Sequence, residues 1–381
     1  MSIKRIPSRR FGSLAFSGLA LIAASIANAQ VTLYGIVDGG VAILDRGGPE
    51  KAVKAVTSGV GAASRWGIRV NEDLGRGLRA GALLESGFDL DVGTLKAFFG
   101  SPSTATPTAP NGTSSTGFNR RSIVFVDGAF GSIALGRDYA PIFYTVFETD
   151  VMRLGYFNNL QELVAPAGGQ ERFARISNSV FYTSPDIGGL RARAAYSFGS
   201  ESSGGAGALP RGANHFAGVG VVYTTGNLVV AGSHQVLTYP LVAGSPAAFT
   251  GATAKRKDAA LSAKLRVGDL TVGTGWFRSG APQNFTDVWL GGAYEFGPSS
   301  LLVQVQRLRQ DNSSGAEKQG TAYALTYVYA LSKRSSLYAS YGRTSNSSTG
   351  SFAVTGSDVV VMPSSPGASS QGLAMGIRHS F

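Results

Sequence analysis

The chain has 381 residues, a formal net charge of +11 and no cysteine, so disulfides, thiolate metal sites and cysteine nucleophiles are excluded. Its basic residues are scattered rather than gathered in runs, which argues against a nucleic-acid-binding arm. Beyond the first 29 residues no run of about 18 apolar residues occurs, which excludes a helical membrane protein.

The first 29 residues have the organisation of an export signal. A basic stretch comes first, at Lys4, Arg5, Arg9 and Arg10. Residues 11–26 are apolar or small apart from a few serines, and Ala27-Asn28-Ala29 matches a cleavage site. A membrane-anchoring helix is the alternative, but the apolar part is shorter than the ~20 residues that such a helix needs. We expect residues 1–29 to be cleaved. The remaining domain, 30–381, then has a formal charge of +7, because four cations leave.

Most of that domain alternates apolar side chains with small or charged ones, which is typical of strands whose two faces meet different surroundings. In 190–198, for example, Leu190 and Tyr196 fall on one face and Arg191 and Arg193 on the other. About sixteen such strands are predicted, at 31–43, 64–71, 77–89, 119–126, 132–138, 175–182, 190–198, 214–224, 228–236, 258–267, 270–277, 288–296, 301–309, 322–331, 337–343 and 371–381. An even number is what a single-chain bacterial barrel requires.

The charged face of these strands identifies the kind of sheet. A slip of one residue would turn Arg193 or Lys264 toward lipid, at roughly 2–4 kcal/mol each near the bilayer midplane. A soluble sandwich would instead have to bury so many arginines in its core. The last strand ends at Phe381 and can pair with the first, which leaves no open edge. The sequence therefore predicts an all-β, antiparallel transmembrane barrel.

The connections between the strands alternate between short and long. Seven are turn sequences rich in Gly, Asp and Asn, at 72–76, 128–130, 185–188, 226–227, 268–269, 297–298 and 332–334. Eight are long, at 44–58, 92–117, 139–174, 200–213, 239–256, 280–286, 311–319 and 345–370. We expect periplasmic turns at one end of the barrel and extracellular loops at the other. Tyrosine, tryptophan and phenylalanine mark many strand ends, as in the aromatic girdles of membrane interfaces.

Short motifs that run from the first expected strand to the last residue carry a family resemblance. Examples are Val-Thr-Leu-Tyr-Gly-Ile-Val-Asp at 31–38, Ser-Arg-Trp-Gly-Ile-Arg at 64–69 and Gly-Ile-Arg-His-Ser-Phe at 376–381. In this ordered set the chain resembles the trimeric sixteen-stranded general porins of the Gram-negative outer membrane, particularly their anion-preferring branch. Val70 departs from the pattern, because the family commonly has a small residue there. The resemblance implies a homotrimer in the outer membrane and a third long loop folded into the lumen.

The resemblance also implies a pore constriction. Arg65, Arg120 and Arg175 resemble the family's constriction arginines, and Glu85 the carboxylate beside them. The alternation independently turns Arg65, Glu85 and Arg120 inward. The third long loop, 139–174, supplies acidic residues that include Glu148, Asp150 and Glu162. Further basic residues are expected on the luminal wall, at Arg69, Arg79, Arg191, Arg193, Lys264, Arg266 and Arg378.

A wall of fixed positive charge lowers the barrier for anions in a narrow passage, and guanidinium groups keep their charge at any relevant pH. We therefore expect a water-filled channel for passive diffusion of small hydrophilic solutes and ions that favours anions. Neutralisation by the nearby carboxylates, leaving weak selectivity, is the alternative. Arg121 and Arg137 fall on less certain faces.

Other function classes have less support. A substrate-specific channel would need a distinctive aromatic or charged track, and an adhesin would need large structured loops. A barrel enzyme would need a nucleophile and a base, but His215, His234 and His379 form no Ser/His/Asp pattern. We expect no enzymatic activity, no catalytic residue, no metal, no cofactor and no nucleic acid. The expected partners are outer-membrane lipids with lipopolysaccharide, small hydrophilic solutes, inorganic ions and identical subunits.

Overall fold

The computed structural model describes residues 29–96, 117–160, 174–200, 209–244, 248–280, 284–311 and 315–381. The expected leader lies outside the described residues except for its last position, and so does Glu162 of the third long loop.

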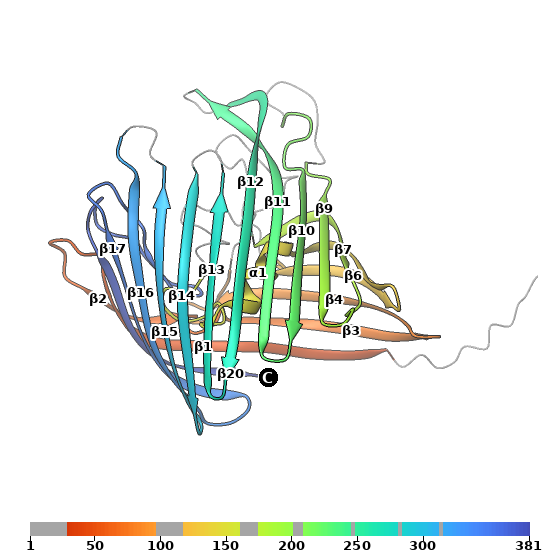
Figure 1. The fold of residues 1–381 in the computed structure, drawn as a ribbon, viewed down its shortest axis with the longest axis horizontal. Helices are drawn as coiled ribbons and strands as arrows, with labels where there is room; N and C mark the ends of the chain where they lie inside the picture. The colour runs from red at the N-terminus through yellow and green to blue at the C-terminus, as the bar shows by residue number, and fades with distance from the viewer. Residues whose placement is uncertain are drawn as a thin grey trace, which may run out of the picture.

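Sixteen long antiparallel strands close into a barrel (Figure 1). They are β1 (Gln30–Asp45), β3 (Arg65–Gly75), β4 (Leu78–Asp89), β6 (Arg121–Gly128), β7 (Gly131–Tyr139), β8 (Arg175–Thr183), β9 (Leu190–Ser197), β10 (Phe216–Thr225), β11 (Leu228–Ala243), β12 (Ala248–Val267), β13 (Leu270–Ser279), β14 (Phe285–Phe296), β15 (Ser299–Gln310), β16 (Lys318–Ala330), β17 (Ser335–Asn346) and β20 (Ser370–Ser380). Each overlaps one of the sixteen predicted strands. Closure occurs where predicted, because β1 pairs with β20 on one side and with β3 on the other.

The two faces of the strands are inverted relative to a soluble protein. On β15, Val303 and Val305 are 45% and 38% exposed, whereas Gln304 and Gln306 are buried. The outer face is therefore apolar and the inner face polar, as the bilayer and an aqueous lumen require. Arg193 lies on the inner side, where it contacts the third long loop, so the predicted strand register is confirmed at this position.

Four short strands lie in the long loops. The strand β2 (Val53–Ser58) lies in the first long loop and pairs with the C-terminal half of β1. The strand β5 (Thr94–Leu95) pairs with the end of β4, and β18 (Val354–Thr355) pairs with β19 (Val360–Val361) in the last long loop.

One predicted loop was wrong. Residues 239–256 were expected as a long loop, but β11 and β12 continue to pair through most of this range, beyond the register shift at Pro240. On its other side β12 pairs with β13, which stops at Ser279, opposite Asp258. The part of β12 before Asp258 therefore extends as a two-stranded ribbon with β11 alone. Proline and the small residues around it hid this extension, because they are poor strand formers when read alone.

The third long loop enters the barrel, as predicted, and begins with the helix α1 (Pro141–Thr149). Proline at the first helical position suits a helix start, because its missing N–H would have no partner there. Ile142 and Val146 are fully buried, and the helix packs on β10, β11 and β12. The loop was expected in the lumen, but its helical start was not predicted. Among the described residues, no helix is long and apolar enough to cross a membrane.

Three segments that are far apart in the sequence meet inside the barrel. Beyond α1, the third loop hydrogen-bonds from Tyr156 N to Val60 O, at 2.7 Å, in the bend between β2 and β3. Asn158 N donates to Thr355 O of the last long loop, at 2.6 Å, and Val354 there is fully buried. The last loop was expected only at the extracellular surface. It folds inward because its apolar residues find partners on the third loop, which a local reading cannot show.

Candidate pore constriction

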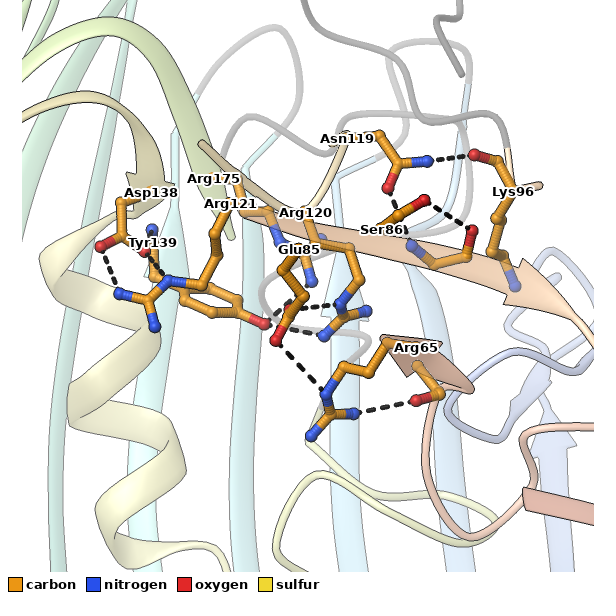
Figure 2. A network of polar contacts seen from close by, with 12 residues as sticks. Arg65, Glu85, Ser86, Lys96, Asn119, Arg120, Arg121, Asp138, Tyr139 and Arg175 are labelled. Atoms are coloured by element: carbon orange, nitrogen blue, oxygen red, sulfur yellow. Dashed lines mark hydrogen bonds and ion pairs between the residues drawn. The ribbon is translucent and has the colours of Figure 1, made fainter. Parts of the chain in front are cut away.

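Glu85 is the centre of a charged cluster on the inner wall (Figure 2). Arg120 Nε lies 2.7 Å from Glu85 Oε1, and Arg65 Nε lies 3.6 Å from Oε2. The Tyr34 hydroxyl donates to the same Oε2 at 3.0 Å. The strand register explains this meeting, because Glu85 on β4 stands opposite Gly67 on β3 and Arg121 on β6. A glycine opposite the carboxylate leaves room for the long side chains of its neighbours.

Tyr139, at the end of β7, joins the remaining arginine to this cluster. Its hydroxyl oxygen accepts hydrogen bonds from Arg120 at 2.9 Å and from Arg175 at 3.0 Å (Figure 2). The Arg175 guanidinium also lies over the ring, 4.6 Å from its centroid. The structure thus brings together Arg65, Glu85, Arg120 and Arg175. Sequence reasoning missed Tyr139, although its spacing of four from Phe143 is a signal that could have found it.

The cluster has more positive than negative charge. Arg65 and Arg120 pair with the single carboxylate of Glu85, and Arg175 joins them through the neutral Tyr139 hydroxyl group. The side chains of Arg120 and Glu85 are each only 7% exposed, whereas that of Arg65 is 24% exposed and reaches the aqueous space. Burial of charge is tolerated at Arg120 and Glu85 because the two groups pair with each other at 2.7 Å.

Two further arginines lie beside the cluster and are fully engaged. Arg121 forms a bidentate pair with Asp138, with both N–O distances at 2.6 Å. Arg137 donates to Asn119 O and to Ser177 Oγ, each at 2.7 Å. Arg121 is thus neutralised by its carboxylate, and Arg137 holds neighbouring segments together.

The acidic residues of the third loop separate in the structure. Glu148 lies on the partly exposed face of α1, where its charge acts on Arg193 and Lys264. Asp150 was expected to face the lumen, but it is only 2% exposed and its carboxylate does not reach the lumen surface. Its two oxygens accept hydrogen bonds from Met152 N at 3.1 Å and Leu154 N at 2.7 Å. Burial raises the pKa of Asp150 to about 6. Asp150 shapes the loop from within.

The expected basic wall divides into two groups. Arg79, Arg191 and Arg266 lie near the short turns, and each has a carboxylate partner, namely Asp127 at 3.6 Å, Asp186 at 3.6 Å and Glu295 at 3.0 Å. The others lie deeper in the lumen or against its aromatic side chains: Arg69 over Tyr34 at 5.9 Å, Arg193 over Tyr144 at 4.0 Å, Lys264 within the field of Glu148, and Arg378 against Tyr156. A cavity of about 350 Å³ next to the cluster is lined by Arg69, Arg79 and Arg121, among others.

The middle of the third loop, around Asn158, is fixed by neutral groups. Asn158 is buried, and its amide donates to Tyr323 O at 2.9 Å and Arg343 O at 3.0 Å. The backbone carbonyl oxygen of Asn158 accepts a hydrogen bond from the Gln306 side-chain amide at 2.6 Å. Beside it, Phe157 fills the space that side chains at Gly342 and Gly372 would need, since an added Cβ would lie 2.5 and 2.8 Å from its atoms. The loop therefore crosses the lumen and is held on both walls.

A closed barrel with an apolar outside, an inserted loop and a charged constriction defines a membrane pore. Residues 15–349 match the family model of the Gram-negative porins. The chain therefore belongs to the Gram-negative porin family and is an outer-membrane channel protein. The family resemblance expected from the sequence is confirmed.

Individual relatives agree with this assignment. The chain is 27% identical to outer membrane porin protein 32 of Delftia acidovorans over 383 residues, which covers 97% of this chain and 99% of that protein. Its fold is similar to that of a solved anion-selective porin from Comamonas acidovorans, with a TM-score of 0.76, 24% identity and coverage of 93% and 100%. It is also similar to the trimer form of OmpT from Vibrio cholerae, with a TM-score of 0.65, 16% identity and coverage of 93% and 99%.

Proposed function

We propose that the channel is a passive diffusion pore for small hydrophilic solutes and ions that favours anions, and that Arg65, Arg120 and Arg175 set this preference. The observation that carries the proposal is the gathering of three guanidinium groups around one carboxylate at the third loop: Arg65 and Arg120 pair with Glu85, and Arg175 joins them through the Tyr139 hydroxyl group. Excess positive charge in a narrow passage with low-dielectric walls lowers the electrostatic barrier for anions. The similarity to the solved anion-selective porin supports the same preference.

Fixed charge rather than a moving part explains the selectivity in this proposal. The third loop is hydrogen-bonded to both walls, so the arginines face a passage of constant shape. Family membership supports a channel without enzymatic activity. Glu148 and the more exposed basic residues, Arg69, Arg79, Arg191, Arg193, Lys264 and Arg266, contribute a weaker field on either side of the cluster in this proposal.

The test is the reversal potential of the purified protein in a planar bilayer under a potassium chloride gradient. We expect the sign of the reversal potential to show a preference for chloride. The Arg65→Gln variant should give a smaller reversal potential, because the Arg65 side chain reaches water and its charge is then lost. The matched control is Arg76→Gln, which removes an exposed arginine from the periplasmic turn after β3 and should leave the potential unchanged. A potential that favours potassium, or a bilayer without conductance, would overturn the proposal.

The same proposal includes a homotrimer. An apolar cavity of about 1010 Å³ opens on the outer face of β1, β17 and β20, lined by Val41, Leu337, Met375 and Ile377, among others. Lipid chains alone can cover such a surface, but identical subunits also fit it, and OmpT of Vibrio cholerae has a trimer form. We expect the detergent-solubilised protein to have three times the chain mass, and Met375→Arg to reduce it to one. A wild-type protein with the mass of one chain would contradict this.

Lipopolysaccharide is proposed as the lipid partner at the extracellular rim. Lys257, Arg278 and Arg309 are exposed on the outer face of β12, β13 and β15, and no ion pair involves them among the described residues. The register places Arg278 and Arg309 on either side of Thr286, with apolar Val288 on the membrane side. Cations above apolar side chains suit the phosphates of an outer-leaflet lipid. Replacing all three by glutamine should lower the lipopolysaccharide that copurifies, and unchanged copurification would remove this partner.

Export of the chain also stays a proposal. We propose that residues 1–29 are removed, so that the protein isolated from outer membranes begins at Gln30. Its intact mass would test this, and a retained leader would contradict it.

A further inference from the structure

Aromatic rings stack in a column along one face of α1, inside the barrel. Tyr139 and Phe143 stack with centroids 3.8 Å apart and planes 18° apart, and Phe143 and Phe147 with centroids 5.8 Å apart and planes 9° apart. The spacing of four residues places Phe143 and Phe147 on one side of the helix, and Tyr139, the last residue of β7, stacks on Phe143 from just before the helix. Tyr144 meets the Tyr139 ring and the Phe143 ring edge-on, at 6.2 and 5.7 Å. We refer to Tyr139, Phe143 and Phe147 as the ring column.

Ile142 and Val146 are the fully buried residues that hold α1 on the wall, and they lie on the side of the helix next to the one that carries Phe143 and Phe147. Phe143 is partly exposed and packs partly against the same core. Phe147 is 42% exposed in the water-filled lumen. Exposed aromatic surface beside polar groups is characteristic of ligand contacts.

Two cations adjoin the rings. The Arg175 guanidinium lies 4.6 Å from the centroid of Tyr139, at the constriction end of the column. The Arg193 guanidinium lies 4.0 Å from the centroid of Tyr144. A planar apolar surface next to guanidinium groups complements a ligand with a planar apolar body and one negative charge. Its body stacks on the rings, and its carboxylate pairs with a guanidinium.

We propose that the ring column, with Arg175 and Arg193, is a low-affinity subsite for aromatic carboxylates on the permeation path. This rests on the proposed function only in requiring that anions pass through the lumen. The subsite makes aromatic carboxylates linger at the constriction, whereas saturated carboxylates of the same size and charge pass by electrostatic attraction alone. A substrate-specific channel needs a distinctive aromatic or charged track, and the ring column with its two arginines has that form.

The test compares benzoate with cyclohexanecarboxylate, which has the same charge and a similar size but no π-system. Each is titrated into chloride solution on one side of a planar bilayer, and the inhibition of single-channel chloride current gives an apparent affinity. We expect benzoate to inhibit at about 3- to 10-fold lower concentration, the range that one aromatic contact provides.

Phe147→Leu keeps an apolar side chain of helix-compatible shape but removes the last ring. It should bring the two inhibition constants to within about twofold of each other, because only the stacking contact is lost. The matched control is Phe198→Leu, which removes a 54% exposed ring just after β9, outside the column, and should leave the ratio unchanged. Arg193→Gln should weaken both carboxylates by a similar factor and preserve their ratio.

Equal inhibition by the two carboxylates in the wild-type channel would overturn the subsite. So would a benzoate preference that survives both Phe147→Leu and Phe143→Leu. Either result can occur with a chloride-selective reversal potential, in which case the proposed function stands. A wild-type channel that favours potassium would instead overturn the proposed function. The two failures are therefore distinguishable in one set of recordings.

Discussion

The start and the middle of the third loop are held by different chemistry. At its start, Tyr139 and α1 adjoin a wall of guanidinium and carboxylate groups at Arg65, Glu85, Arg120 and Arg175. Near its middle, Asn158 is held by backbone carbonyls and by the neutral side chains of Gln304, Gln306 and Thr344. Both attachments are buried and dense in hydrogen bonds, yet only one of them produces an electric field.

This difference teaches how a pore can combine rigidity with selectivity. Neutral amide hydrogen bonds fix a loop without placing net charge near the passage, and they avoid the desolvation penalty of buried ions. The charged wall accepts that penalty, and in the proposed function its field acts on passing ions. Substitutions at the start of the loop should therefore change ion preference, and those around Asn158 should change the width of the passage.

The largest effect is expected for Glu85→Gln. It leaves Arg65 and Arg120 without their carboxylate, which should lower the free energy of unfolding by about 3–5 kcal/mol and increase the preference for chloride. The matched control is Glu295→Gln, because Glu295 also contacts two arginines, Arg153 and Arg266, but its side chain is 32% exposed. That change should cost less than about 1 kcal/mol. Thermal unfolding in detergent and reversal potentials measure both, and equal costs would contradict the distinction.

Asn158→Ala should have the next largest effect. The substitution removes the side-chain amide that donates to the backbone carbonyls of Tyr323 and Arg343. The free energy of unfolding should therefore fall by about 2–4 kcal/mol. With its anchor lost, the loop should narrow the lumen less, so single-channel conductance should rise while chloride preference persists. Asn178→Ala is the control. Asn178 also has a positive φ, 51° against 49° for Asn158, but its side-chain amide donates to Gly199 O on the barrel wall instead of holding the loop. Conductance changes of the same size in both variants would sink the idea.

A pH effect of intermediate size is expected from Asp150. Its pKa is raised by burial from 3.8 to about 6, so the folded protein binds this proton more tightly than the unfolded chain does. The free energy of unfolding should therefore fall as pH rises from about 4 to 6, by at most about 1.4 kcal/mol per unit. Asp150→Asn has no such titration and should flatten this part of the profile. Parallel profiles for the two proteins would contradict the assignment.

Arg79→Gln should have the smallest effect. Its side chain is 64% exposed, and it meets Asp127 only at 3.6 Å near the periplasmic end of the barrel. We expect a change in stability within about 0.5 kcal/mol and a slight loss of chloride preference, much smaller than that for Arg65→Gln. A loss as large as that for Arg65→Gln would show that the wall, rather than the cluster around Glu85, sets selectivity.

The barrel could be predicted strand by strand because its signal is local. A residue that faces lipid and a residue that faces water must alternate along every strand, and this alternation is written into the sequence. The cluster at Glu85 was predictable in part for a related reason, since the alternation turns Arg65 and Glu85 inward. Alternation alone would place Arg120 on the side of the exposed Val124; it lies inside because it precedes β6, which begins at Arg121. Arg175 needed the family resemblance.

The interior beyond the wall could not be predicted, because its partners are remote in sequence. Tyr139 reads as an ordinary strand end until Arg120 and Arg175 meet its hydroxyl group. Asp150 looks like an acid available to the lumen, and only the fold of its own loop shows that its oxygens bind backbone N–H groups. The last loop reads as a polar surface loop, although Val354 is fully buried against the third loop.

The attachment of Asn158 also orders events during the biogenesis of the channel. Its partners Gln304 and Thr355 come 146 and 197 residues later in the chain. A nascent or partly inserted polypeptide that has only its first half in place can form the bond of Tyr156 to Val60 but not these bonds of Asn158. Contacts that span so much sequence form late, because the intervening chain must first be brought together. The aperture consequently reaches its final size only after the C-terminal third of the chain has been threaded into the bilayer.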